Sequence, residues 1–339
     1  MFSEFNPNPT GPRRRELSLP ELVAGIRSAD IPTLARAVTI IESSNPRHLQ
    51  MAEELLIRLL PFTGGSVRVG ITGVPGAGKS TFIEALGMYL IGLGRRVAVL
   101  AIDPSSGLTG GSILGDKTRM PRLAAAPGAY IRPSPSAGTL GGVARKTRES
   151  LLLCEAAGFD VVLVETVGVG QSETVVADMT DCFLGLMLPG AGDELQGIKR
   201  GLLELVDVIA VNKADGPLRT LAEIAARQYQ NALRSLAGRH TEPPTVLTCS
   251  ALEGRNIDAV WRAIDDRQQT LIQRGELAEL RRRQNLRWLW SLVDDQLRQA
   301  VQNHPRVQQI RGELEQQVLT GQLPASAAAR RILEAFRSS

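Results

Sequence analysis

Cysteine, histidine and aromatic residues are scarce in this chain of 339 residues. The three cysteines, Cys154, Cys182 and Cys249, lie far apart and form no C-x-x-C pair, so neither a disulfide framework nor a zinc site is predicted. The three histidines are equally scattered, which disfavours a histidine-rich metal centre. Aromatic residues make up 4% of the chain and leave few rings for stacking bases. We therefore expect no nucleic-acid binding.

Long apolar runs are also missing. The most apolar stretch, Leu86–Ile102, is interrupted by Gly92, Gly94 and the pair Arg95–Arg96, so no membrane span is predicted. The N-terminal segment, Met1–Arg15, lacks the apolar core of a secretory signal. The hydrophobic share of 43% and the charged share of 22% are ordinary, and the net charge of +4 comes largely from short arginine clusters. We expect a soluble cytoplasmic protein that binds no membrane.

Three successive patterns divide the chain. Residues 1–62 predict a helical N-terminal extension, in which Ser18 and Glu21 have capping-box spacing, a second helix runs from Pro32 to Glu42, and a third runs from Asn45 to Pro61. Residues 63–275 alternate short apolar strands with helices, which predicts an α/β domain with a mostly parallel sheet covered on both faces. Residues 276–339 predict a helical C-terminal extension, interrupted at Pro305 and at Gly321–Pro324, that packs on the main domain or on a second subunit.

Six strands are expected in the central segment: Val67–Thr72, Val97–Ile102, Val161–Glu165, Cys182–Leu188, Val206–Asn212 and Thr245–Cys249. In such a sheet, ligands bind at the carboxyl ends of the strands. A ligand site is therefore expected among the residues that follow each strand.

A glycine-rich loop follows the first expected strand. Gly73–Ser80 has the sequence GVPGAGKS, which matches the phosphate-loop pattern between a strand and a helix. Its glycines let backbone N–H groups turn toward phosphates, Lys79 reaches the β and γ phosphates, and Ser80 ligates Mg²⁺. The residues expected to bind nucleotide here are Gly73, Val74, Pro75, Gly76, Ala77, Gly78, Lys79, Ser80 and Thr81.

A second motif assigns the base. Asn212, Lys213 and Asp215 form an N-K-x-D box at the end of an expected strand. The Asp215 carboxylate accepts from both guanine N1–H and the exocyclic amine, a donor pair that adenine lacks. The next strand ends in Cys249-Ser250-Ala251, which resembles the short loop by which GTPases hydrogen-bond guanine O6 through a backbone N–H. Ser250, Ala251 and Leu252 are therefore added to the nucleotide site. The sequence therefore predicts GTP and GDP as ligands.

Acidic residues lie between these boxes. Glu165 ends a strand and opens the sequence ETVG, which resembles the Walker-B and D-x-x-G element, with Gly168 as the residue that senses the γ-phosphate. Asp103 ends the preceding strand, and Asp116 lies in the loop beyond it. Each acid could instead be a solvated loop residue, but their positions by strand ends favour convergence on Mg²⁺.

One expected residue is absent. Ras-like GTPases place a glutamine directly after the D-x-x-G glycine, where it orients the attacking water. Here Val169 occupies that position, and Gln171 lies two residues further on. We therefore predict slow intrinsic GTP hydrolysis that a partner accelerates.

From Gly70 to about Gly254 the chain closely resembles the MeaB/ArgK-like P-loop GTPases of the SIMIBI type, which are accessory proteins of adenosylcobalamin-dependent methylmalonyl-CoA mutase. The identifying stretches, beside the boxes above, are Gly110–Pro121, Tyr130–Val143, Glu165–Thr174, Gly192–Leu202 and Arg283–Ser291.

The resemblance implies a metal shell of Ser80, Asp103, Asp116 and Glu165. It also implies a mobile segment from 190 to 201 whose Lys199 swings toward the phosphates, although Lys199 could equally be an exposed lysine. Lys79, Asp103, Glu165 and Lys199 are thus the candidate catalytic residues. The resemblance further implies a homodimer formed through the C-terminal helices, and a role in gating cobalamin delivery to the mutase and protecting it. No cobalamin motif occurs here, so the partner mutase is expected to hold the cobalamin.

Three alternatives stay open at this point. An older association of the family with arginine transport suggests an ATPase or kinase, against which the N-K-x-D box argues. A nickel-insertion GTPase would share the sheet topology, but its usual His or Cys clusters are absent from the sequence. The mutase partner could also be a related enzyme such as isobutyryl-CoA mutase.

Overall fold

The computed structural model describes residues 15–102, 119–133, 140–166, 172–190, 200–235 and 243–337. Contacts divide the chain into two compact units, residues 1–268 and 269–339. The domain boundaries expected from the sequence, after residues 62 and 275, stay predictions.

A seven-stranded sheet with the order β3-β2-β4-β1-β5-β6-β7 forms the centre of the first unit. All its strand pairs are parallel. The strands are β1 (Val67–Gly73), β2 (Val97–Ile102), β3 (Ala129–Arg132), β4 (Val161–Thr166), β5 (Cys182–Met187), β6 (Val208–Val211) and β7 (Thr245–Thr248). The predicted α/β class and parallel sheet are confirmed. The edge strand β3 was not expected from the sequence.

Each face of the sheet carries its own hydrophobic core, because alternate side chains of a strand point to opposite faces. On β4, Val162 and Val164 belong to one core and Val161 and Leu163 to the other. The first core is covered by α7 (Leu140–Ala156), α8 (Ser172–Ala177), α10 (Arg200–Leu203) and α11 (Arg219–Ser235), and the second by α4 (Lys79–Gly92), α6 (Pro121–Ala125) and α12 (Ile257–Gln273). Helices on both faces leave the carboxyl ends of the strands free for a ligand.

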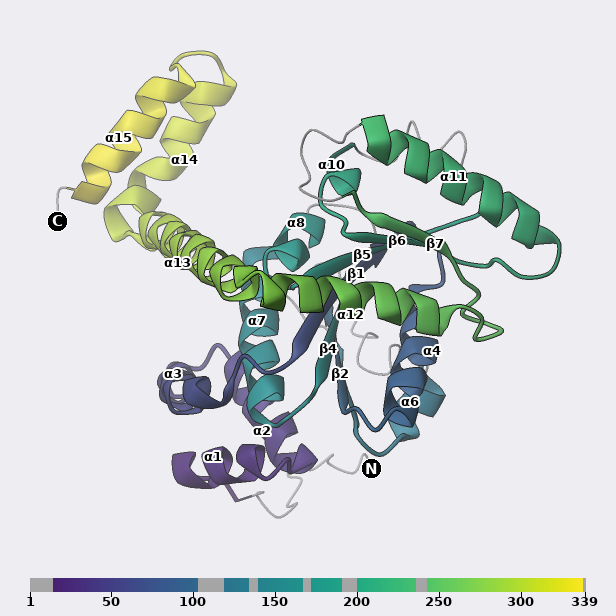
Figure 1. Ribbon diagram of the computed structural model, residues 1–339. Coiled ribbons are helices and arrows are strands. Elements are labelled where there is room, and N and C mark those ends of the chain that lie inside the picture. Colours follow the sequence, from purple (N-terminus) through teal and green to yellow (C-terminus); the bar gives the residue numbers. More distant parts are fainter. Residues whose placement is uncertain are drawn as a thin grey trace, which may run out of the picture. The chain divides into compact units, whose positions relative to one another are not determined.

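Three N-terminal helices, α1 (Leu19–Arg27), α2 (Ile31–Glu42) and α3 (Pro46–Leu59), pack on one another and on α7 (Figure 1). Their starts follow the sequence signals: Ser18 and Glu21 form the predicted capping box, and the Asn45 side chain caps α3 before Pro46. Buried residues of these helices, including Leu22 and Leu55, share the core of the sheet face covered by α7. A short 3₁₀ helix, η1 (Leu60–Phe62), leads from α3 into β1, and a second, η3 (Gly216–Leu218), precedes α11.

A buried ion pair fixes α7 to the start of β1. Arg68 donates from Nε and Nη2 to the Glu155 carboxylate at 2.9 and 2.8 Å. Glu155 also accepts from the backbone N–H of Gly64 at 2.9 Å. Both charged side chains are almost fully buried. The pair was not foreseen, since 87 residues separate its members in the chain.

The second unit contains α13 (Glu276–Asn303), α14 (Pro305–Leu319) and α15 (Ala325–Arg337). The breaks fall where the sequence predicted them, at Pro305 and in the segment 321–324. The His304 ring packs edge-on against Phe336, with centroids 5.3 Å apart, and so ties the start of α14 to α15. Among the helices that the structure describes, none has the length and apolar character needed to cross a membrane.

Candidate functional site

The phosphate loop connects β1 to α4. Gly76 and Gly78 adopt positive φ angles of 79° and 83°, a backbone conformation that side chains disfavour. At Gly73 the constraint is space, because an added Cβ would lie 2.3 Å from the carbonyl oxygen of Leu186 on β5. The Ala77 side chain is buried in the core beneath α4, and Val74 is partly buried against it. Pro75 and Thr81 are exposed. Glycine is thus favoured by the backbone conformation at Gly76 and Gly78 and by the close approach of β5 at Gly73.

Lys79 is the first residue of α4, and its side chain folds back over the loop. Its Nζ donates a hydrogen bond to the Gly73 carbonyl oxygen at 2.8 Å. Burial lowers the pKa of Lys79, while the charges of Glu165 and Glu173 act in the opposite direction. Two carboxylates therefore favour the ammonium form that phosphate binding requires.

Glu165, near the end of β4, lies beside the loop, as predicted for a metal-binding acid. Its Oε1 is 3.5 Å from Ser80 Oγ, and the residue is 6% exposed. Two oxygens on opposite sides of one Mg²⁺ are about 4.2 Å apart, so both atoms fit within a single coordination shell. The next residue, Thr166, donates its hydroxyl to Thr72 at 2.9 Å and fixes the end of β4 to the end of β1. Ser80 and Glu165 thus form a hard-oxygen pair suited to Mg²⁺.

Several predicted residues lie outside the described part of the chain. These are Asp103, Asp116, Gly168, Val169, Gln171 and Lys199. Their roles stay predictions. Within the described ranges, no group of three or more His, Cys, Asp or Glu side chains is placed to hold a metal ion.

Asn212 follows β6 and joins the two halves of the site. Its Nδ2 donates to the Ala77 carbonyl oxygen in the phosphate loop at 2.8 Å, and its Oδ1 accepts from the backbone N–H of Ala251 at 3.0 Å. The residue is 2% exposed. An added Cβ on Gly78 would lie 3.0 Å from Asn212 Nδ2, so the third motif glycine also makes room for this contact. The sequence indicated Asn212 as part of the base-binding box, but its link to the phosphate loop was not expected.

The Asp215 carboxylate is held by the loop after β7. Ser250 Oγ donates to Asp215 Oδ2 at 2.5 Å and accepts from the backbone N–H of Glu253 at 3.1 Å. The backbone N–H of Ala214 donates to the Cys249 carbonyl oxygen at 3.0 Å. With one carboxylate oxygen engaged by Ser250, the group is oriented before any ligand arrives.

Two neighbouring residues complete this region. Lys213 adopts a positive φ of 58°, which carries the chain from β6 into the Asp215 turn. Leu252 is 81% exposed, so it offers apolar surface beside the base-binding loop. The two base-binding boxes predicted from the sequence are therefore adjacent in space and hydrogen-bonded to each other.

The sequence matches the model of a known protein family. The model of the family described as "Methylmalonyl Co-A mutase-associated GTPase MeaB" matches residues 34–306. A protein of Mycobacterium tuberculosis described as a probable GTPase is 55% identical, over 92% of this chain and 94% of its own length. GTPase ArgK of Escherichia coli is 52% identical, over 83% of this chain and 86% of its own length.

A solved structure shares the fold. The crystal structure of a protein described as "LAO/AO transport system kinase" superimposes with a TM-score of 0.76 at 41% sequence identity, and the match covers 94% of this chain and 98% of the other. Similarity therefore extends over nearly the whole chain, including the helices that flank the nucleotide site.

Proposed function

The chain belongs to the family of methylmalonyl-CoA mutase-associated GTPases, and from this premise we propose that its GTP-hydrolysis cycle serves an adenosylcobalamin-dependent acyl-CoA mutase. The protein is a GTPase of the MeaB/ArgK type. The observation that carries the mutase assignment is the match of the family over residues 34–306. In this proposal, the protein gates delivery of cobalamin to methylmalonyl-CoA mutase and protects the enzyme, and the mutase itself holds the cobalamin.

Catalysis is proposed to rest on groups around the phosphate loop. Lys79 would leave the Gly73 carbonyl for the β and γ phosphates, a short movement for a flexible side chain. Ser80 and Glu165 would hold Mg²⁺, joined by Asp103 and Asp116. When bound, Mg²⁺ neutralises charge on the phosphate oxygens during transfer to water. Lys199 is proposed to approach the phosphates as a further cation.

Selection of guanine is proposed to depend on the loop after β7. Asp215 would accept from guanine N1–H and the exocyclic amine, with Ser250 fixing its orientation. The backbone N–H of Ala251 is held by Asn212, so the neighbouring residues Ser250 and Leu252 would form the rest of the base pocket. This arrangement favours GTP over ATP.

Two further features are proposed from the family. Val169, in place of the water-orienting glutamine, makes intrinsic hydrolysis slow, so the GTP-bound state persists until the mutase accelerates turnover. The helices of residues 276–339 form a homodimer contact. The mutase would then distinguish the GTP-bound from the GDP-bound protein through a shift between ordered and disordered loop conformations.

The direct test is a titration of methylmalonyl-CoA mutase with the protein bound to GDP or to a non-hydrolysable GTP analogue. Affinity at least ten-fold different between the two states supports the proposal. Equal affinity, or no association in either state, refutes it. The same titration with isobutyryl-CoA mutase decides between the two candidate partners.

A second candidate is suggested by the similar solved structure, which is described as a transport system kinase. A kinase would transfer the γ-phosphate to a protein rather than to water. Incubation with labelled GTP and ATP separates the two activities, because free phosphate is the product of a GTPase alone. The Asp215 and Ser250 pair favours the guanine-specific alternative.

A further inference from the structure

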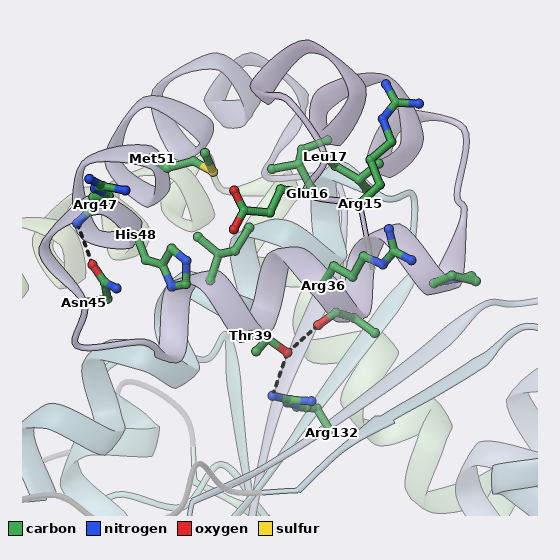
Figure 2. A pocket seen from close by; sticks show the side chains of 14 residues that line it. Arg15, Glu16, Leu17, Arg36, Thr39, Asn45, Arg47, His48, Met51 and Arg132 are labelled. Atoms are coloured by element: carbon green, nitrogen blue, oxygen red, sulfur yellow. Dashed lines mark hydrogen bonds between the residues drawn. The ribbon is translucent and has the colours of Figure 1, made fainter. Parts of the chain in front are cut away.

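The three N-terminal helices enclose a groove that the nucleotide chemistry does not use. Its volume is 860 Å³, and its walls come from the segment before α1, from α2, from the start of α3 and from Arg132 at the end of β3. Figure 2 shows the side chains that line it. Apolar side chains, among them Leu17, Ile40 and Met51, form part of its lining. The groove is therefore amphipathic.

Four arginines and one carboxylate, that of Glu16, line this groove, and two of the arginines are paired, Arg15 with Glu21 and Arg132 with Glu42. Arg36 and Arg47 are both exposed, and within the described ranges neither side chain forms an ion pair. Glu42 is the one acidic residue of α2. Its carboxylate already accepts hydrogen bonds from Arg132, from Nε at 3.0 Å and from Nη2. Exposed arginines on helices are commonly balanced by acids three or four residues away. Here the acids that could balance Arg36 and Arg47 are lacking.

The positions of the charges indicate the shape of the ligand. In Figure 2, Arg47 lies at one end of the groove and Arg15 and Arg36 lie toward the other, with Met51 and Glu16 between them. A compact anion such as phosphate needs donors that converge on one point, whereas these cations are spread out and flank a carboxylate. An extended segment with separate acidic side chains and apolar residues between them fits the pattern.

The groove also touches the edge of the sheet that binds nucleotide. Arg132 is the last residue of β3 and pairs in register with Leu100 of β2, two residues before the end of that strand. The residue directly after β2 in the sequence is Asp103, a predicted Mg²⁺ ligand. Because the strands are parallel, their carboxyl ends share one edge with the phosphate loop. A ligand that competes with Glu42 or Thr39 for Arg132 would therefore act at the same edge of the sheet as the phosphate loop, with β2 and β4 between β3 and β1.

From these observations we propose that the groove lined by Arg36, Arg47 and Arg132 is a docking site for an acidic, amphipathic segment of the partner protein. This inference rests on the proposed function only for the identity of the partner, the mutase. The chemistry of the segment follows from the charge and apolar lining of the groove itself.

The test compares two double variants of the full chain. The first variant, Arg36→Glu with Arg47→Glu, reverses the charge of two arginines that line the groove. The matched control, Arg227→Glu with Arg234→Glu, makes the same charge change at two exposed arginines of α11. Thermal unfolding and GTP turnover without partner are measured for both and should equal those of the parent, since these residues lie outside the nucleotide site. Any difference in partner binding then reports on the groove.

The binding probes are methylmalonyl-CoA mutase with the GTP analogue, and a dye-labelled twelve-residue peptide of leucine and glutamate followed by fluorescence anisotropy. Charge reversal at Arg36 and Arg47 should weaken the affinity for mutase and for the peptide at least ten-fold. The affinities of the control variant should stay within two-fold of those of the parent. A peptide with lysine in place of glutamate should bind the parent at least ten-fold more weakly.

The outcomes separate the two proposals. If the groove variant binds mutase and peptide as the parent does, the docking site is refuted and the mutase partnership stands. If the peptide binds as predicted while the mutase does not bind at all, the docking site stands and the proposed function falls. Displacement of the peptide by an equal concentration of inorganic pyrophosphate would identify a small-anion site and overturn the proposal.

Discussion

The carboxamide of Asn212 donates a hydrogen bond to the carbonyl oxygen of Ala77 at 2.8 Å, across 135 residues of sequence. This contact joins the phosphate-loop motif to the predicted base-binding box. The same side chain accepts from Ala251, so three segments meet at one buried amide. The geometry of the nucleotide site therefore depends on a residue that has no predicted contact with the reacting atoms.

Replacement of Asn212 by alanine should weaken GTP and GDP binding by a similar factor, on the order of 10- to 100-fold. The reason is that the buried Ala77 carbonyl and Ala251 N–H lose their partner, at about 1–3 kcal/mol for each unsatisfied group. Titration calorimetry measures both affinities. Gln317→Ala is the control, since it removes a side-chain amide bonded to the exposed Glu313 carboxylate of α14. Affinities of the Asn212 variant within two-fold of the parent would contradict this role.

Replacement of Asp215 by alanine should reduce GTP affinity by about 100-fold or more, because two hydrogen bonds to a charged acceptor are lost. ATP affinity should not change. Competition between GTP and ATP for a fluorescent nucleotide measures both, with Asp258→Ala, whose carboxylate lies at the surface of α12, as the control. The guanine assignment fails if GTP affinity survives the change or if the parent binds ATP equally well.

Local sequence signals were sufficient for the main features of the fold. The capping box at Ser18, the Pro46 start of α3 and the break at Pro305 are each decided by a few adjacent residues, and the structure agrees with all three. The phosphate loop was also identifiable, because Gly76 and Gly78 adopt positive φ angles that favour glycine. Its flanking strand and helix are confirmed.

The sequence did not predict features that depend on contacts between residues far apart in the chain. β3 has only four residues and ends in Arg132, so it carries no clear strand periodicity, and it forms because β2 offers a free edge. The Asn212 contact with Ala77 and the groove around Arg36 require segments whose proximity is decided by the tertiary fold. Sequence patterns encode such relationships only indirectly.

Replacement of Glu155 by glutamine should lower the free energy of unfolding by about 3–5 kcal/mol, because Arg68 would remain buried without its counter-charge. Urea unfolding measures the change, and GTP affinity of the folded fraction should be unaltered. Glu279→Gln, which removes an exposed ion-pair partner in α13, should leave stability unchanged. A stability equal to the parent's for the Glu155 variant would show that the pair does not fix α7 to β1.

All three thiols should react slowly in the native protein. Cys154, Cys182 and Cys249 are buried, and burial raises the pKa of Cys249 to about 12. At pH 8 its thiolate fraction is then about 10⁻⁴. Labelling with a thiol reagent should be slow at pH 8 and complete after unfolding in urea. One rapidly reacting equivalent in the native state would contradict the burial.

The same pKa shift predicts a dependence of stability on pH. The folded protein retains the Cys249 proton between pH 9 and 12, where the unfolded chain loses it. The free energy of unfolding should therefore fall as pH rises through this range. Comparison with a Cys249→Ala variant isolates this contribution. An identical pH dependence for the two proteins would rule it out.

The central claim is that the chain is a slow GTP switch governed by its partner, and single-turnover hydrolysis of GTP tests it most directly. Phosphate release is followed for the protein alone and with saturating methylmalonyl-CoA mutase. The account predicts a rate well below about 1 s⁻¹ alone, and at least a ten-fold increase with the mutase. A rate near 1 s⁻¹ without partner, or no acceleration by the mutase, would contradict it.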